Sequence, residues 1–130
     1  MLVEIIQPFL KKGWVFVLRI ACYNINKMRL EHYSLEKLKK EILEILRRHI
    51  DLKTHKVFFF GSRVSNTGSD RSDIDIGIEG PKEVPSLAMA KICEEIENLP
   101  TLYKIDIVDF KNVSNKFKSV ALKNIELINQ

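Results

Sequence analysis

Residues 56–78 read KVFFFGSRVSNTGSDRSDIDIGI, and local patterns within them predict two strands joined by a loop. It begins with an apolar and aromatic run, Lys56 to Phe60, which is too short for a helix and ends at a glycine. Such a run predicts a buried strand. Residues 66–72 are rich in Asn, Thr, Gly, Ser and Asp, which predicts a loop. Isoleucine then alternates with Asp or Gly over residues 73–78, which predicts a second strand with one polar face.

The sequence on either side predicts helices and a third strand. Ser34 is a suitable N-cap for a helix that extends to about Ile50, because apolar residues recur there every three or four positions. Further along, the patterns predict a helix at 86–99, a strand at 104–110 and a last helix at 114–128. This order favours an α+β (α/β) fold in which helices cover one face of a small mixed β-sheet.

Composition limits the class of protein. The 130 residues suit one domain, and 45% hydrophobic with 29% charged residues is an ordinary globular balance. No apolar run approaches the roughly 20 residues that span a bilayer, and none has the core of a secretory signal. Cys22 and Cys93 lie far apart with no metal-ligand spacing, which is typical of reduced, structural cysteines. We expect a cytoplasmic protein that has no membrane partner.

The net charge of +4 is unevenly distributed. Residues 1–27 contain four basic residues against Glu4 alone, so this segment carries most of the excess. We treat 1–27 as an N-terminal extension of unknown role, with Met28 as an alternative start, and 28–130 as the domain. The near-neutral domain has no dense Lys/Arg stripe with interleaved aromatic residues, which argues against nucleic-acid binding.

Residues 56–78 contain two aspartates that could bind a cation. Asp73 and Asp75 lie two residues apart on a predicted strand, so both carboxylates leave the same face and repel one another. A Mg²⁺ ion would relieve this repulsion, although such a pair alone is more typical of an exposed strand edge. Gly61 and Ser62 change that balance, because a Gly-Ser turn after a buried strand can approach a phosphate closely.

The same residues resemble a known family. Gly61-Ser62, ten intervening residues and Asp73-Ile74-Asp75 are similar to the signature of the minimal nucleotidyltransferases, within the polymerase-β-like nucleotidyltransferase superfamily. The resemblance covers residues 28–130 and implies the nucleotidyltransferase fold. The signature is specific for the superfamily but not for the substrate.

The resemblance also implies roles for individual residues. The family's third carboxylate corresponds to Asp106, whereas Asp109 lies on the opposite face of its predicted strand. Two Mg²⁺ ions would be held by Asp73, Asp75 and Asp106, with ATP as the substrate and these aspartates as catalytic residues. Nucleotide-binding residues would be Gly61, Ser62 and Arg63. The family's second arginine is replaced here by Ser65, and Arg71 could supply a compensating charge.

Small members of this family resemble one half of a two-gene pair. The partner is a helical HEPN-domain toxin, and the resemblance implies an antitoxin that transfers AMP from ATP to tyrosines of that toxin. Two alternatives remain open: a small-molecule nucleotidyltransferase of the aminoglycoside type, and a non-catalytic antitoxin that acts by binding. A chain of this size also leaves open a homodimer or a hetero-oligomer.

Overall fold

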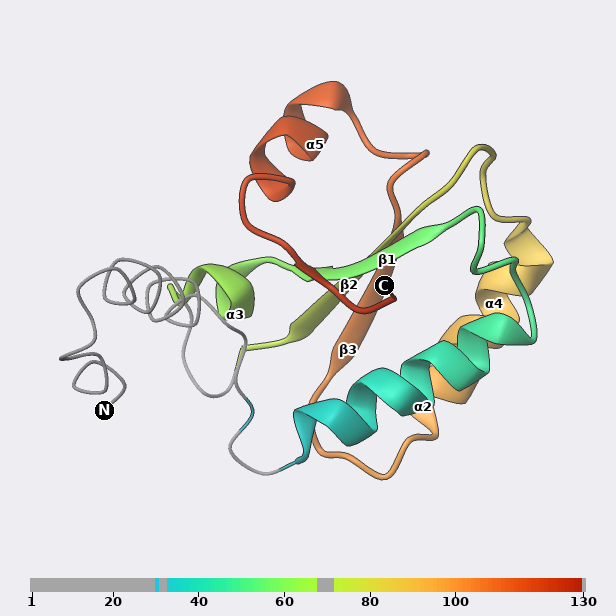
Figure 1. Cartoon of the computed structure of the whole chain (residues 1–130), viewed down its shortest axis with the longest axis vertical. Coiled ribbons are helices and arrows are strands. Elements are labelled where there is room, and N and C mark those ends of the chain that lie inside the picture. The colour runs from blue at the N-terminus through green and yellow to red at the C-terminus, as the bar shows by residue number, and fades with distance from the viewer. Residues whose placement is uncertain (1–29, 31–32, 68–71, 130) are drawn as a thin grey trace, which may run out of the picture.

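The computed structural model of the chain describes residues 30, 33–67 and 72–129 (Figure 1). The expectations for residues 1–27, Met28 and Arg71 therefore lie outside the described residues. The elements, in chain order, are α2 Leu35–Arg47, β1 Lys56–Phe60, α3 Ser62–Ser65, β2 Ile74–Glu79, α4 Ser86–Glu97, β3 Ile105–Asp109, α5 Asn115–Ala121 and β4 Glu126–Leu127. The predicted strands and the first two helices are confirmed to within a few residues at each end.

The strands form one mixed sheet in the order β3-β2-β1-β4. The central strands β1 and β2 are antiparallel, and β4 is antiparallel to β1 at the other edge. By contrast, β2 and β3 are parallel, because the chain crosses between them through α4. The predicted small mixed sheet is thus confirmed.

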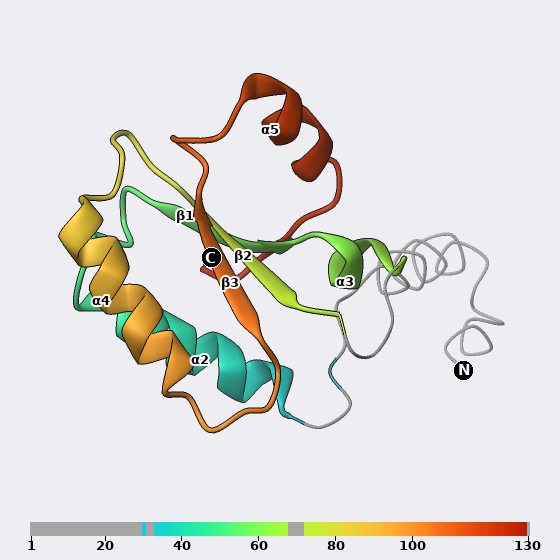
Figure 2. The ribbon, with the colours of Figure 1, turned by 180° about the vertical axis from the view of Figure 1, so that it is seen from behind.

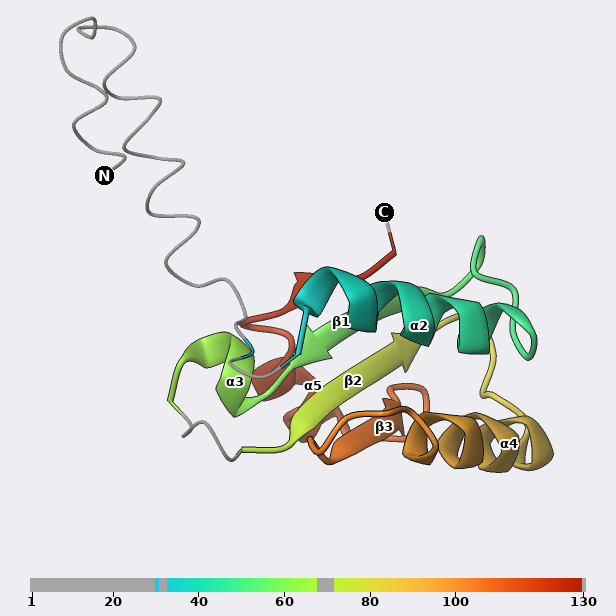
Figure 3. The same ribbon diagram turned by 90° about the horizontal axis from the view of Figure 1, so that it is seen from below.

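Helices lie on both faces of this sheet, so the expectation that they cover one face is wrong. The two long helices, α2 and α4, lie side by side on one face, and α5 lies on the other (Figures 1 and 2). Seen from the side of the long helices, α5 is behind the sheet (Figure 3). Alternate residues of β1 serve the two faces, since Val57 and Phe59 join the core under α2 and α4, whereas Phe58 and Phe60 pack with Phe110 on the α5 side. This double covering explains why the whole run from Val57 to Phe60 is buried.

The last predicted helix, 114–128, is wrong in its second half. The helix starts at its Ser114 cap but ends at Ala121, and Glu126–Leu127 instead form β4 beside β1. Tertiary pairing overrides the helical periodicity here, because β4 supplies backbone partners to an edge of β1 that would otherwise be open. The burial also alternates as in a strand: Leu127 packs with the Phe58 cluster and Ile128 with the opposite core.

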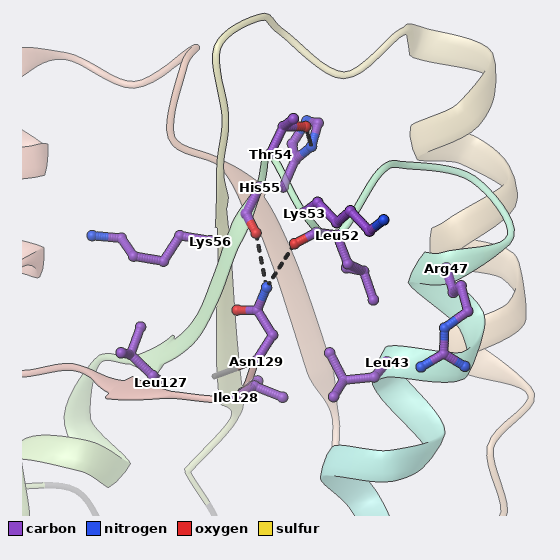
Figure 4. A pocket seen from close by; sticks show the side chains of 10 residues that line it. All are labelled: Leu43, Arg47, Leu52, Lys53, Thr54, His55, Lys56, Leu127, Ile128 and Asn129. Atoms are coloured by element: carbon purple, nitrogen blue, oxygen red, sulfur yellow. Dashed lines mark hydrogen bonds between the residues drawn. The ribbon is translucent and has the colours of Figure 1, made fainter.

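One side chain fastens the C-terminal segment to the rest of the fold. The Asn129 amide oxygen accepts a hydrogen bond from the Val57 backbone N–H at 2.8 Å. Its amide nitrogen donates to the carbonyl oxygens of Leu52 at 3.2 Å and His55 at 2.8 Å (Figure 4). The loop before β1 and the segment after β4 are therefore held together by a single amide group.

We expect the substitution Asn129→Ala to lower the free energy of unfolding by about 2 kcal/mol, because it leaves the N–H of fully buried Val57 without its acceptor. Urea unfolding followed by circular dichroism measures this loss. The control is Asn112→Ala, an exposed position where a change within about 0.5 kcal/mol is expected. Equal stability of the two variants would contradict the fastening role of Asn129.

Candidate active site

Two of the predicted acidic residues come together through strand register. Asp75 of β2 lies directly beside Asp106 of the parallel strand β3. Both line one cavity of about 790 Å³ at the α5 side of the sheet. Asp73 precedes the first residue of β2, and its side chain is 46% exposed. The structure therefore brings the Asp75 and Asp106 carboxylates into one site, with Asp73 at its margin.

The Gly-Ser turn lies against the same carboxylates. Gly61 has a φ of +84° and a ψ of −163°, a conformation that side chains rarely allow. A Cβ atom at this position would lie 2.3 Å from Asp75 Oδ2, so the glycine backbone directly abuts the carboxylate. Gly61 and Ser62 also line the cavity. The turn and the acidic pair therefore share one ligand-sized space.

Electrostatics within this group favour a cation. Burial raises the pKa of Asp75, and the neighbouring charges of Asp106 and Asp73 raise it further, while Lys104 lowers it. The Lys104 ammonium lies 3.9 Å from Asp73 Oδ2 and 3.9 Å from Asp106 Oδ1. The positively charged side chain of Lys104 thus already lies near two of the carboxylates. Unsatisfied repulsion of this kind is what a bound metal ion would relieve.

The donor chemistry suits Mg²⁺, since carboxylate oxygens are the protein ligands that this ion prefers. Within residues 33–67 and 72–129, however, no three His, Cys, Asp or Glu side chains are arranged so that they could hold a metal ion together. The pair Asp75 and Asp106 is the part of the set that the sheet positions rigidly. Asp73 precedes β2, and its side chain is exposed to nearly the same extent as that of Asp106, at 46% against 44%.

We expect Asp75→Asn to raise the melting temperature of the metal-free chain at neutral pH. The folded-state pKa of Asp75 is above its ordinary value of 3.8, so ionisation destabilises the fold at high pH, and this penalty disappears as the pH falls below 3.8. Thermal melts in EDTA between pH 3 and pH 8 should show an advantage of the variant that shrinks with decreasing pH. Asp51→Asn, at an exposed position on a loop, serves as the control. An Asp75→Asn chain that melts below wild type at pH 8 would contradict the repulsion.

Arg63 takes a different position from its two neighbours. Its side chain is buried, with 8% exposure, while Gly61 and Ser62 open into the cavity. Arg63 Nε donates to the carbonyl oxygen of Ser72 at 2.8 Å, and the guanidinium carbon lies 4.7 Å from the centre of the Tyr103 ring. The structure thus turns Arg63 toward the protein interior.

Asp109 has a structural role. It is 7% exposed, and its carboxylate accepts hydrogen bonds from the backbone N–H groups of Val84 at 2.7 Å and Lys111 at 2.9 Å. These contacts hold the loop before α4 and the turn after β3. This placement agrees with the expectation that Asp109 lies on the opposite face of its strand from Asp106.

Sequence reasoning missed the far wall of the cavity. Helix α5 and the turn after it contribute Phe117, Val120, Ala121, Lys123 and Asn124 to its lining. Two of these apolar residues remain open to solvent, since Phe117 is 42% and Val120 62% exposed. The available signal is the apolar periodicity of the expected helix 114–128, which does not indicate which of its residues face a ligand. The cavity is thus acidic on the strand side and partly apolar on the α5 side.

The amino-acid sequence matches the model of a known family. The family model described as "Polymerase beta, Nucleotidyltransferase" matches residues 40–130, well over half of the chain. The chain therefore belongs to the polymerase beta nucleotidyltransferase family. No curated protein sequence matches it. Among the residues that the structure describes, no helix is long and apolar enough to cross a membrane.

Particular solved structures share the fold. A toxin–antitoxin structure with AMP-PNP has a TM-score of 0.57 at 21% identity, and the match covers 69% of this chain and 71% of that one. The structure of a tri-AMPylated HEPN toxin from Shewanella oneidensis in complex with an MNT antitoxin gives a TM-score of 0.53 at 21% identity, covering 72% and 71%. A toxin–antitoxin MntA-HepT structure gives 0.51 at 20% identity, covering 69% and 68%. At these identities the likeness establishes the fold.

Proposed function

We propose that this chain is a Mg²⁺-dependent nucleotidyltransferase that transfers AMP from ATP to a tyrosine hydroxyl of a HEPN-domain toxin, and so acts as its antitoxin. Family membership supports the reaction class. The similarity to structures named as toxin–antitoxin complexes, one with AMP-PNP and one with an AMPylated HEPN toxin, supports the nucleotide, the acceptor and the partner.

One observation carries the proposal: Asp75 and Asp106 lie side by side on neighbouring strands, with the backbone of Gly61 against the first of them. A phosphate chain that enters the cavity would meet both the Gly-Ser turn and the two carboxylates, because all of them line it. Two anionic groups in the same cavity repel one another, and a cation bound between them relieves this repulsion. The arrangement therefore favours a substrate whose phosphates share metal ions with the protein.

Each residue of the site then has a distinct task. Bound Mg²⁺, held by Asp73, Asp75 and Asp106, would neutralise phosphate charge and lower the pKa of the attacking hydroxyl. Gly61 lets the backbone approach the triphosphate because it has no side chain, and Ser62 offers its hydroxyl as a donor. Asp106 would accept the proton of the acceptor hydroxyl.

The bond changes follow from the substrate. The tyrosine oxygen forms a bond to the α-phosphorus of ATP, the bond from that phosphorus to the bridging oxygen breaks, and pyrophosphate leaves. The hydroxyl proton passes to Asp106 and then to solvent. In such a reaction the protein mainly positions the groups and compensates their charge.

Incubation of the purified chain with labelled ATP and Mg²⁺ tests the proposal, with and without the protein encoded by the adjacent gene. We expect label on that protein and none on an aminoglycoside added in parallel. Label on the aminoglycoside would instead identify a small-molecule enzyme. A tight complex that forms without transfer of label, whichever divalent metal ion is added, would identify an antitoxin that acts by binding alone.

A further inference from the structure

Arg63 contacts the segments that lead into both acid-bearing strands. Its Nε donates to the carbonyl oxygen of Ser72, the residue directly before Asp73. Its guanidinium lies over the ring of Tyr103, which is three residues before Asp106. One side chain from the helical turn α3 therefore touches the segment before β2 and the segment before β3.

These segments are also joined to each other. Ile74 lies between Asp73 and Asp75 in the sequence, and its backbone N–H donates to the carbonyl oxygen of Lys104 at 2.9 Å. Arg63 spans this junction from the side of the Gly-Ser turn. A shift of either segment would therefore change the spacing between the carboxylate of Asp73 and that of Asp106.

The burial of Arg63 separates this arrangement from direct phosphate binding. A guanidinium remains charged in proteins, and its planar shape suits hydrogen bonding at the edge and stacking on an aromatic face. Arg63 uses both modes on the protein itself, and it is 8% exposed. Gly61 and Ser62, directly before it, line the 790 Å³ cavity instead.

We propose that Arg63 is a positioning residue, which holds the segments before β2 and β3 together and so keeps Asp75 and Asp106 side by side to bind a divalent cation. It does so without contacting the nucleotide. This inference rests on the proposed metal-dependent function and adds to it a residue outside the cation and nucleotide contacts.

The primary test is Mn²⁺ binding by the full-length chain without nucleotide, followed by the loss of the free Mn²⁺ electron paramagnetic resonance signal. We expect Arg63→Met to weaken Mn²⁺ binding about 10- to 100-fold, the range typical of residues that orient metal ligands. The matched control is Arg47→Met, which replaces an exposed arginine of α2 and should leave the affinity unchanged. Circular dichroism checks that each variant is folded.

A second pair of variants keeps the test decisive if Arg63→Met does not fold. Tyr103→Leu removes the ring beneath the guanidinium and is expected to weaken Mn²⁺ binding about tenfold. Tyr103→Phe keeps the ring and should bind Mn²⁺ as wild type does. The contrast between leucine and phenylalanine isolates the stacking contact from any general loss of packing.

Transfer kinetics separate positioning from nucleotide binding. With saturating metal, Arg63→Met should lower kcat while the KM for ATP stays within about twofold. A KM for ATP that rises tenfold or more, with Mn²⁺ affinity unchanged, would overturn the inference and make Arg63 a nucleotide-binding residue. Wild-type Mn²⁺ binding with no AMP transfer would refute the proposed function, while weaker Mn²⁺ binding in Arg63→Met would still support positioning. A wild-type chain that binds no Mn²⁺ would overturn both proposals.

Discussion

Replacing Asp75 by asparagine is expected to lower AMP transfer about a thousandfold while the chain stays folded. Asp75 is the carboxylate that both touches the Gly61 turn and lies in register with Asp106. Its loss removes a negative oxygen from the proposed cation site, and metal-based charge stabilisation contributes several kcal/mol to such reactions. About 4 kcal/mol corresponds to a factor of roughly a thousand in rate.

The measurement is single-turnover transfer of label from ATP to the purified partner. Asp73→Asn should show the same direction of effect, and Asp51→Asn, remote from the cavity, should retain wild-type rates. The folded state of Asp75→Asn is checked by its melting temperature, which is expected to exceed that of wild type because the pKa of Asp75 is raised by burial and by its acidic neighbours. An active Asp73→Asn, Asp75→Asn double variant would refute the assignment of the metal site.

Replacing Gly61 by alanine is expected to lower transfer about a hundredfold and to destabilise the fold by about 1–3 kcal/mol. Two separate causes add. The backbone of Gly61, at φ +84° and ψ −163°, is in a region that is essentially restricted to glycine. The added Cβ would also lie 2.3 Å from Asp75 Oδ2, so the carboxylate must move away from its place beside Asp106.

A double-mutant cycle with Asp75→Ala separates the two causes. Shortening Asp75 removes the atom that the new Cβ would meet, so Gly61→Ala should cost less stability in that background. The backbone strain should remain. If Gly61→Ala costs the same in both backgrounds, then the turn does not contact the carboxylate, and the proposed shared ligand space is wrong.

Local patterns were sufficient for most of the fold. The alternation of isoleucine with Asp or Gly at 73–78 fixed the face on which Asp75 lies, and the buried run 56–60 identified the central strand. The helical periodicity after Ser114 misled, because the pairing of Glu126–Leu127 with β1 depends on a strand about seventy residues earlier in the chain. A local sequence pattern does not indicate which distant strand a segment will pair with.

Local sequence patterns likewise predict some residues of the candidate site and not others. Spacing alone placed Asp73, Asp75 and the Gly-Ser turn together, because a short loop and one antiparallel pair connect them. Asp106 required the family resemblance, since nothing local indicates that β3 is parallel to β2 in the register that pairs it with Asp75. The burial of Arg63 could not be read from its neighbours, because it arises from tertiary contacts with Ser72 and Tyr103.

If the acidic residues beside the Gly61 turn direct transfer of the nucleotidyl group, the position of the label in ATP determines whether the acceptor becomes labelled. Parallel reactions with the proposed HEPN-domain partner would contain ATP labelled at the α-phosphate or at the γ-phosphate. We predict that the partner gains the α-label only, because the γ-phosphate leaves in pyrophosphate, and that EDTA abolishes this gain. Transfer of the γ-label, or formation of a stable complex with neither label, would contradict nucleotidyl transfer by this chain.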